Sequence, residues 1–160
     1  MAHATVEVAA PADDVWAVLE DPWTYANWVV GTVKIRDADP GWPAVGSRLH
    51  HAVGAWPLTL QDETEVLECD PGTRLLMQAR GWPAGEASVE LVLHSYGDRT
   101  RVEMAEEPTA GPGAWVNNRL VEAVGAKRLT ETLDRLRRLV EGHRRDGRST
   151  RRSAAPADPS

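Results

Sequence analysis

The chain has 160 residues, of which 42% are apolar and 26% are charged, and its formal net charge is −6. These values are typical of one globular domain, and no stretch approaches the ~18 consecutive apolar residues that a membrane-spanning helix needs. Cys69 is the one cysteine, which excludes an internal disulfide and a multi-cysteine metal site. The first residues lack the basic and apolar segments of a signal peptide, so we expect a cytoplasmic protein without stable membrane insertion.

The charge is distributed unevenly along the chain. Five arginines lie after residue 141, at positions 144, 145, 148, 151 and 152, so the part before them is more acidic than the total suggests. Phosphate contacts need clustered lysine and arginine on a folded face. The acidic body therefore disfavours nucleic acid as the main partner.

The chain opens with one strand and two short helices. Residues 3–8 alternate between apolar and polar side chains, which predicts a half-buried strand. Pro11, followed by two aspartates, is typical of a helix start, and Pro22 ends that helix. Residues 23–28 predict a second short helix, which Gly31 closes.

From residue 32 onward the apolar period changes to two, and it returns to a helical period after residue 112. The last helix carries one apolar stripe, ends at Gly142 and is followed by a basic tail, residues 142–160, that we expect to be disordered. The six strands expected before that helix lie at about 32–36, 46–53, 58–69, 73–81, 87–95 and 100–107.

This order of elements resembles the START-related, Bet v 1-like superfamily (SRPBCC), and most of all its bacterial members labelled polyketide cyclase/dehydrase. The resemblance covers about residues 3–141. It implies an α+β helix-grip fold, in which about seven curved antiparallel strands and two short helices enclose a cavity beneath one long C-terminal helix. It also implies a ligand-binding domain over residues 1–141 that takes a small hydrophobic molecule. The segments that carry the resemblance are 10–16, 21–28, Gly46, Asp70-Pro71, 97–102 and 128–136.

Three ionisable residues fall in the apolar, inward register of their strands. They are His51, Asp62 and Glu106. A charge buried alone is costly, so such groups are usually paired, solvated in a pocket or neutralised by a shifted pKa. They predict either a polar patch that orients a ligand or moves a proton, or a purely structural network. His50 points to the opposite face from His51, which disfavours a metal site, and no cofactor is expected.

The same register, together with the cavity that the resemblance implies, predicts which side chains contact a ligand. We expect this set to comprise Tyr25, Trp28, Val33, Leu49, Val53, Leu60, Thr64, Met77, Val89, Leu91, Met104, Trp115, Asn118 and Val121. Trp16 is expected in the core, whereas Trp42, Trp56 and Trp82 each precede a proline and are expected at the rim or the surface. Arg80 and Cys69 are expected to point outward.

Three functions remain open from the sequence. The first is a carrier or sensor of a small hydrophobic or aromatic, lipid- or polyketide-like molecule. The second is a polyketide cyclase or dehydratase-type enzyme, in which His51 is the general acid or base, Asp62 orients it and Glu106 is a second acid or an anchor. The third is an interaction module that uses exposed tryptophans and the basic tail. A homodimer is left open.

Overall fold

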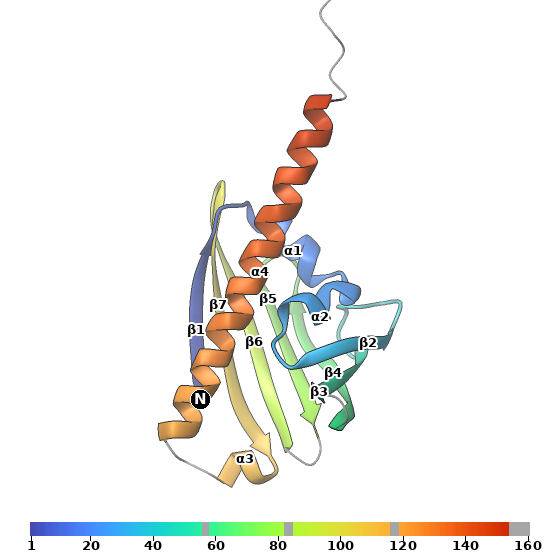
Figure 1. Cartoon of the computed structure of the whole chain (residues 1–160), viewed down its shortest axis with the longest axis vertical. Coiled ribbons are helices and arrows are strands. Elements are labelled where there is room, and N and C mark those ends of the chain that lie inside the picture. The colour runs from blue at the N-terminus through green and yellow to red at the C-terminus, as the bar shows by residue number, and fades with distance from the viewer. Residues whose placement is uncertain (56–57, 82–84, 116–118, 154–160) are drawn as a thin grey trace, which may run out of the picture.

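The computed structural model describes residues 1–55, 58–81, 85–115 and 119–153. Its centre is one curved sheet of seven antiparallel strands in the order β1-β7-β6-β5-β4-β3-β2 (Figure 1). The fold class expected from the sequence is confirmed. The strands are β1 (Ala2–Val8), β2 (Thr32–Ala38), β3 (Arg48–Ala55), β4 (Leu58–Asp70), β5 (Arg74–Gly81), β6 (Gly85–Tyr96) and β7 (Arg99–Ala110).

The two short helices follow β1, as expected. Helix α1 (Ala12–Leu19) begins after the extended Pro11, and a 3-10 turn, η1 (Pro22–Thr24), leads into α2 (Tyr25–Trp28). The Asp21 carboxylate caps η1 by accepting a hydrogen bond from the Trp23 backbone N–H at 3.1 Å. These helices lie across the concave face of the sheet.

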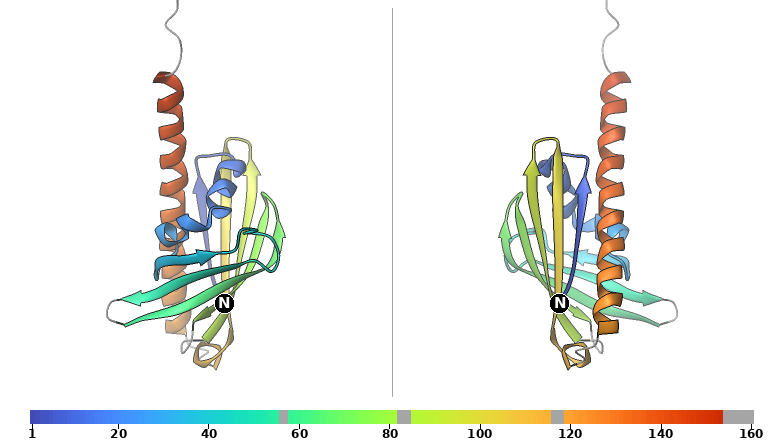
Figure 2. Two further views of the ribbon diagram at one scale, coloured as in Figure 1. Left: turned by 90° about the vertical axis from the view of Figure 1, so that its right-hand side faces the viewer. Right: turned by 90° about the vertical axis from the view of Figure 1, so that its left-hand side faces the viewer.

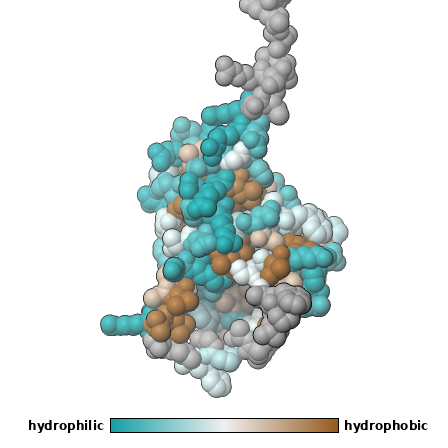
Figure 3. Space-filling view, viewed as in Figure 1, coloured by the Kyte–Doolittle hydropathy of each residue, from teal (hydrophilic) through white to brown (hydrophobic). Residues whose placement is uncertain are grey.

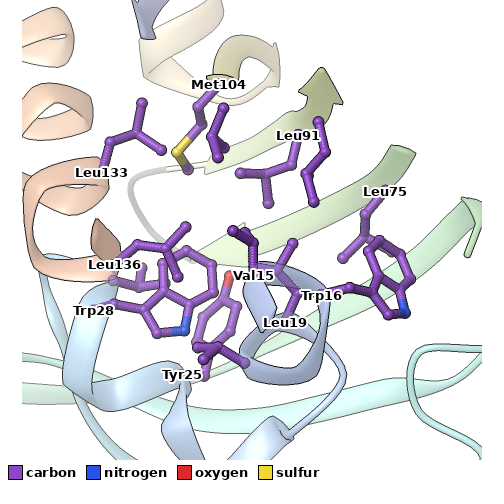
Figure 4. Close-up of a cluster of buried hydrophobic side chains, with 14 of the residues drawn as sticks. Val15, Trp16, Leu19, Tyr25, Trp28, Leu75, Leu91, Met104, Leu133 and Leu136 are labelled. Atoms are coloured by element: carbon purple, nitrogen blue, oxygen red, sulfur yellow. The ribbon is translucent and has the colours of Figure 1, made fainter. Parts of the chain in front are cut away.

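The long helix α4 (Arg119–Ser153) follows the short α3 (Pro112–Trp115) and crosses the sheet diagonally beside β1 (Figures 1 and 2). Its apolar stripe is buried at Leu129, Leu133, Leu136 and Val140, each no more than 1% exposed. Figure 4 shows Leu133 beside Met104 of β7, and Leu136 beside the rings of α2. This seam joins the helix to both the sheet and the short helices. Among the described residues, no helix is long and apolar enough to cross a membrane.

Both ends of α4 differ from expectation. The helix does not end at Gly142 but continues to Ser153, so residues 142–153 of the expected disordered tail are helical. At the other end, the apolar residues Leu120, Val121 and Val124 are 68%, 45% and 63% exposed. Figure 3 shows apolar surface gathered over this first part of α4.

Two β-bulges change which side chains face the core. In β2 the register shifts between Thr32 and Lys34, so Thr32 and Ile35 both face inward and Val33 is 54% exposed. In β4 the register shifts between Val66 and Glu68, which turns Cys69 toward the core against Leu75. The outward prediction for Cys69 and the inward one for Val33 are therefore wrong, because strict alternation assumes an uninterrupted ladder.

Two of the tryptophans singled out in the sequence, Trp16 and Trp42, lie in the core. Trp16 is 8% exposed, as expected for a core residue. Trp42 is wrong as a rim or surface residue, because it is also 8% exposed and its indole N–H donates to the Leu19 carbonyl at 3.2 Å. Trp56 and Trp82 lie outside the described residues.

Candidate ligand cavity

A cavity of about 400 Å³ lies between one end of the concave sheet face, α2 and α4. The other end of that face is closed by α1: Figure 4 shows Trp16 and Leu19 packed toward Leu75 and Leu91. The cavity lies toward the end of the sheet where β3, β5 and β7 end and β4 and β6 begin. Its walls are formed by Tyr25, Val29, Val30, Gly31, Thr32, His51, Val53, Gly54, Asp62, Thr64, Ala79, Arg80, Gly81, Gly85, Glu86, Ala87, Val89, Met104, Glu106, Pro108, Ala110 and Arg128.

His51, Thr64 and Tyr25 form a buried polar cluster in the wall. His51 is 4% exposed, and its Nε2 lies 2.9 Å from the Thr64 hydroxyl oxygen. The Tyr25 ring stacks on the imidazole with centroids 5.8 Å apart, and it meets Trp28 edge-on at 5.1 Å. Packing against the Tyr25 ring therefore fixes the imidazole, and Thr64 is the hydrogen-bond partner of one of its two nitrogens.

Burial determines the protonation of this cluster. It lowers the pKa of His51 to about 4, with further lowering by the nearby charges of Arg36 and His50. Burial also raises the pKa of Tyr25 to about 12, although hydrogen bonding to Thr64 opposes that rise. At neutral pH both side chains are thus uncharged and act as hydrogen-bonding groups.

Asp62 lies directly opposite His51 in the β3–β4 ladder, but the two side chains do not form the expected hydrogen-bonded pair. The His51 Nδ1 atom has no hydrogen-bond partner, and one Asp62 oxygen accepts the Glu63 backbone N–H at 2.7 Å. The other oxygen lies against Gly81, where an added Cβ would approach it to 2.8 Å. Asp62 therefore occupies room left by a glycine on β5 and does not orient the imidazole.

The environment of Asp62 favours its protonated form. Burial raises its pKa to about 6, the Glu63 backbone hydrogen bond opposes the rise, and the carboxylates of Glu63 and Glu86 add to it. Within the described residues its carboxylate forms no ion pair. Asp62 is consequently a cavity-wall acid that titrates close to neutral pH.

Glu106, the third predicted ionisable residue, is paired with an arginine that the sequence reasoning missed. The Arg128 guanidinium of α4 donates to the Glu106 carboxylate of β7, and a second nitrogen contacts the Val30 carbonyl at 3.5 Å. One turn further along α4, the Thr132 hydroxyl accepts the Val30 backbone N–H at 3.2 Å. Arg128 and Thr132 thus bond to the carbonyl and the N–H of Val30, respectively. Together with the Glu106 pair, these contacts connect α4, β7 and the chain after α2 around the cavity.

The predicted contact residues fall into three groups. Tyr25, Val53, Thr64, Val89 and Met104 line the cavity together with His51, Asp62 and Glu106. Trp28, Leu49, Met77 and Leu91 face inward but are core residues, because the short helices fill that part of the concave face. Val33, Leu60, Trp115 and Val121 are 54%, 41%, 88% and 45% exposed and lie outside the lining, while Asn118 lies outside the described residues.

The sequence contains one signal for Arg128. Thr132 and Leu136 follow it at four-residue intervals and are both buried, so Arg128 belongs to the face of α4 that meets the sheet. Arg80 of β5 also lines the cavity, so the expectation that it points outward is wrong for part of the side chain. Its guanidinium pairs with Glu63 at 2.7 Å and with Glu65 at 3.4 Å.

The shifted pKa values of His51 and Asp62 make the folding stability depend on pH in opposite directions. Because folding lowers the pKa of His51 from 6.5 to about 4, its contribution to stability rises with pH across that interval. Because folding raises the pKa of Asp62 from 3.8 to about 6, its contribution falls as pH rises through that interval. We expect D62N to steepen the gain in unfolding free energy between pH 4.5 and 7 by about 1 kcal/mol, a value reduced for partial exposure.

Urea unfolding at the two pH values measures this difference. H51Q is the reciprocal variant and should flatten the same profile. Equal slopes for wild type and D62N would show that Asp62 has the same pKa in the folded and unfolded chains.

The chain matches one protein-family profile, described as "Polyketide cyclase / dehydrase and lipid transport", over residues 2–141. Comparison with curated proteins gives no match. Among solved structures, protein NE0264 from Nitrosomonas europaea is 18% identical with a TM-score of 0.69, covering 89% of this chain and 94% of its own. A START superfamily protein from Mycobacterium smegmatis is 19% identical with a TM-score of 0.67, covering 88% and 96%.

A third similar structure is DynU16, a protein of the dynemicin biosynthetic locus. It is 23% identical with a TM-score of 0.61, and the match covers 88% of this chain and 46% of that chain. Identities this low show a shared fold, whereas the family profile covers most of the sequence. The chain therefore belongs to the polyketide cyclase/dehydrase and lipid transport family.

Proposed function

We propose that the protein binds a small hydrophobic or aromatic molecule, lipid- or polyketide-like, as a carrier or sensor. The observation that carries this proposal is the cavity of about 400 Å³, whose size is within the range of small-molecule sites. Much of its wall consists of backbone and aliphatic groups from Val53, Ala79, Ala87, Val89 and Met104. Removing this apolar surface from water favours an apolar ligand by about 25 cal/mol per Å² buried.

The polar groups of the wall indicate what else the ligand carries. Tyr25 and Thr64 supply hydroxyl groups from one side, and the Glu106–Arg128 pair lies on the other. Because Arg128 pairs with Glu106 and Arg80 pairs with Glu63, the described residues of the cavity wall include no unpaired arginine for a fully ionised ligand. The arrangement favours an amphipathic molecule with a hydroxyl or carbonyl group over a lipid anion.

Filling the cavity should abolish binding without unfolding the protein. Ala87 lines the cavity, whereas its neighbour Ser88 lies on the opposite face of β6. We expect A87W to weaken binding of the neutral fluorescent probe N-phenyl-1-naphthylamine by about tenfold or more, and S88W to bind it as wild type does. Fluorescence titration measures the dissociation constants, and circular dichroism checks that each variant is folded.

Equal probe binding by A87W, S88W and the wild type would place the ligand elsewhere. Native mass spectrometry of the purified protein is the complementary measurement. A retained small molecule that A87W loses and S88W keeps would identify the ligand class directly.

A cyclase or dehydratase-type reaction is the second candidate, and Asp62 favours it. A carboxyl group in a cavity wall with a pKa of about 6 accepts or donates a proton near neutral pH, which is worth about 10²–10⁴-fold in proton-transfer reactions. In this candidate Asp62 is the acid or base, Glu106 with Arg128 anchors the substrate, and His51 contributes a neutral hydrogen-bonding ring. Turnover that D62N abolishes while probe binding persists would establish the enzyme; turnover that D62N leaves unchanged would exclude this role.

A further inference from the structure

The wall of the ligand cavity carries more acidic than basic side chains. Its described charged residues are three carboxylates and two arginines: Asp62, Glu86, Glu106, Arg80 and Arg128. The imidazole of His51 is uncharged at neutral pH, because burial lowers its pKa to about 4. When the carboxylates are ionised, these lining residues therefore carry one net negative charge.

The ion pairs of the wall assign this excess charge to Asp62. Arg128 pairs with Glu106. Arg80 is shared by three carboxylates, at 2.7, 3.4 and 3.6 Å, which belong to Glu63, Glu65 and Glu86. Within the described part of the chain, no basic side chain pairs with Asp62. Both arginines of the wall thus have other acidic partners.

Asp62 lies where an uncompensated carboxylate is costly. It is partly buried, one oxygen accepts the Glu63 backbone N–H at 2.7 Å, and the other oxygen lies against Gly81. Burial raises its pKa to about 6. A carboxylate that is removed from water is stabilised by a cation, and most by one that donates hydrogen bonds. The cavity therefore favours a ligand that supplies such a cation.

A second polar group of the wall also lacks a partner. His51, opposite Asp62 in the β3–β4 ladder, is 4% exposed, and its Nδ1 atom has no hydrogen-bond partner among the described residues. Because the ring is uncharged, it does not repel a cation, and it can hydrogen-bond a polar group of a ligand. Val53 of β3 and Ala79 of β5 line the same cavity with apolar side chains. The wall thus fits a molecule with a polar end and an apolar body.

An organic cation fits this wall better than a metal ion. Within the described ranges, no group of three or more His, Cys, Asp or Glu side chains could hold a metal. One carboxylate and one imidazole supply too few ligands for such an ion. An ammonium group needs only one carboxylate, and its N–H groups can be shared with neighbouring acceptors.

We propose that the ligand is an amphipathic amine, whose protonated nitrogen pairs with the Asp62 carboxylate while its apolar body fills the cavity. This inference rests on the proposed binding function and specifies the class of ligand. Neutral or anionic molecules of the same size cannot form the ion pair, and they bind more weakly. Asp62 then determines specificity within a cavity whose apolar wall supplies the general affinity.

Two small probes that share one ring system test the contribution of the charge. At pH 7.5 1-naphthylmethylamine is a cation, and 1-naphthalenemethanol is its neutral counterpart with a hydroxyl in place of the amine. Each is titrated as a competitor of N-phenyl-1-naphthylamine. We expect wild type to bind the amine about tenfold more tightly than the alcohol, and D62N to bind the two equally.

The preference for the amine should also depend on pH. The titratable and charged groups around Asp62 and across the cavity are Tyr25 of α2, Arg36 of β2, His51 of β3, Glu63 of β4, Arg80 of β5, Glu86 of β6, Glu106 of β7 and Arg128 of α4. Asp62 is mostly ionised at pH 7.5 and mostly protonated at pH 5, whereas His51 is mostly uncharged at both. We therefore expect the preference of wild type to fall several-fold between pH 7.5 and pH 5.

Glu68 provides the matched control on the same strand. It lies outside the cavity lining and pairs with Arg74. E68Q removes the same formal charge as D62N, so it should keep the wild-type preference for the amine, and circular dichroism checks the fold of both variants. The inference is overturned if wild type binds amine and alcohol equally, if D62N keeps the preference, or if E68Q loses it. Failure of the proposed binding function is distinguishable, because A87W then binds N-phenyl-1-naphthylamine as wild type does.

Discussion

Replacing Leu133 with alanine should lower the free energy of unfolding by about 2–5 kcal/mol. Leu133 is 1% exposed and packs beside Met104 in the seam between α4 and the sheet (Figure 4). The substitution removes buried methyl groups and leaves a hole that neighbours on a rigid helix and sheet fill only in part. Urea unfolding at neutral pH, followed by circular dichroism, measures the loss.

Val124 provides the control in the same helix. It is 63% exposed, so V124A should change the unfolding free energy by no more than about 0.5 kcal/mol. Since alanine has a higher helix propensity than leucine or valine, propensity would cause no loss in either variant. A similar loss in both variants would therefore mean that the effect of these substitutions does not follow burial. That result would contradict the assignment of α4 as the main element packed over the sheet.

Replacing Gly85 with alanine should be more damaging than its small size suggests, lowering the unfolding free energy by about 3 kcal/mol or more. Gly85 has a φ of +122°, and a Cβ there would lie 2.1 Å from the carbonyl oxygen of Ala110. Backbone cannot move aside as a side chain can, so the start of β6 and the end of β7 would separate. Both positions line the cavity, and probe binding should fall together with stability.

Gly97 separates the steric contribution from the conformational one. It also has a positive φ, +72°, but an added Cβ there meets no atom within 4 Å. G97A should therefore cost only about 1–2 kcal/mol, the penalty of the left-handed backbone conformation. Thermal or urea unfolding of both variants makes the comparison, and equal losses would exclude the contact with Ala110 as the cause.

The order of the elements could be predicted from the sequence because each type has a local signature. Alternation identified the strands, Pro11 and Pro22 bounded the first helix, and the stripe through Leu129, Leu133 and Leu136 identified the long one. The end of that helix could not be predicted, because Gly142 is compatible with both a cap and an exposed helical position. Helix formation beyond it depends on contacts that the local sequence does not report.

The sequence predicted which face of the sheet carries the candidate site residues, but it did not predict which residues their side chains contact. Alternation correctly placed His51, Asp62 and Glu106 on the cavity wall. It did not reveal that Thr64 contacts the imidazole, that Gly81 accommodates the Asp62 carboxylate, or that Arg128 pairs with Glu106. Those contacts depend on neighbouring strands and on a helix 22 residues further along the chain. Strand register predicts which face of the sheet a side chain occupies, whereas a hydrogen bond depends on distances between side chains that the register does not give.

Alternation failed altogether at the bulges, and the bulge at Val33 has a consequence for assembly. β2 is an edge strand of the sheet, and an exposed, regular edge is a template for pairing with strands of other molecules. The register shifts at Thr32/Lys34 and Ile35/Asp37 interrupt the row of backbone groups that such pairing needs. The opposite edge, β1, runs beside α4 (Figure 1). The same register shifts that made the alternation prediction fail in β2 thus protect this edge of the sheet against pairing with other molecules.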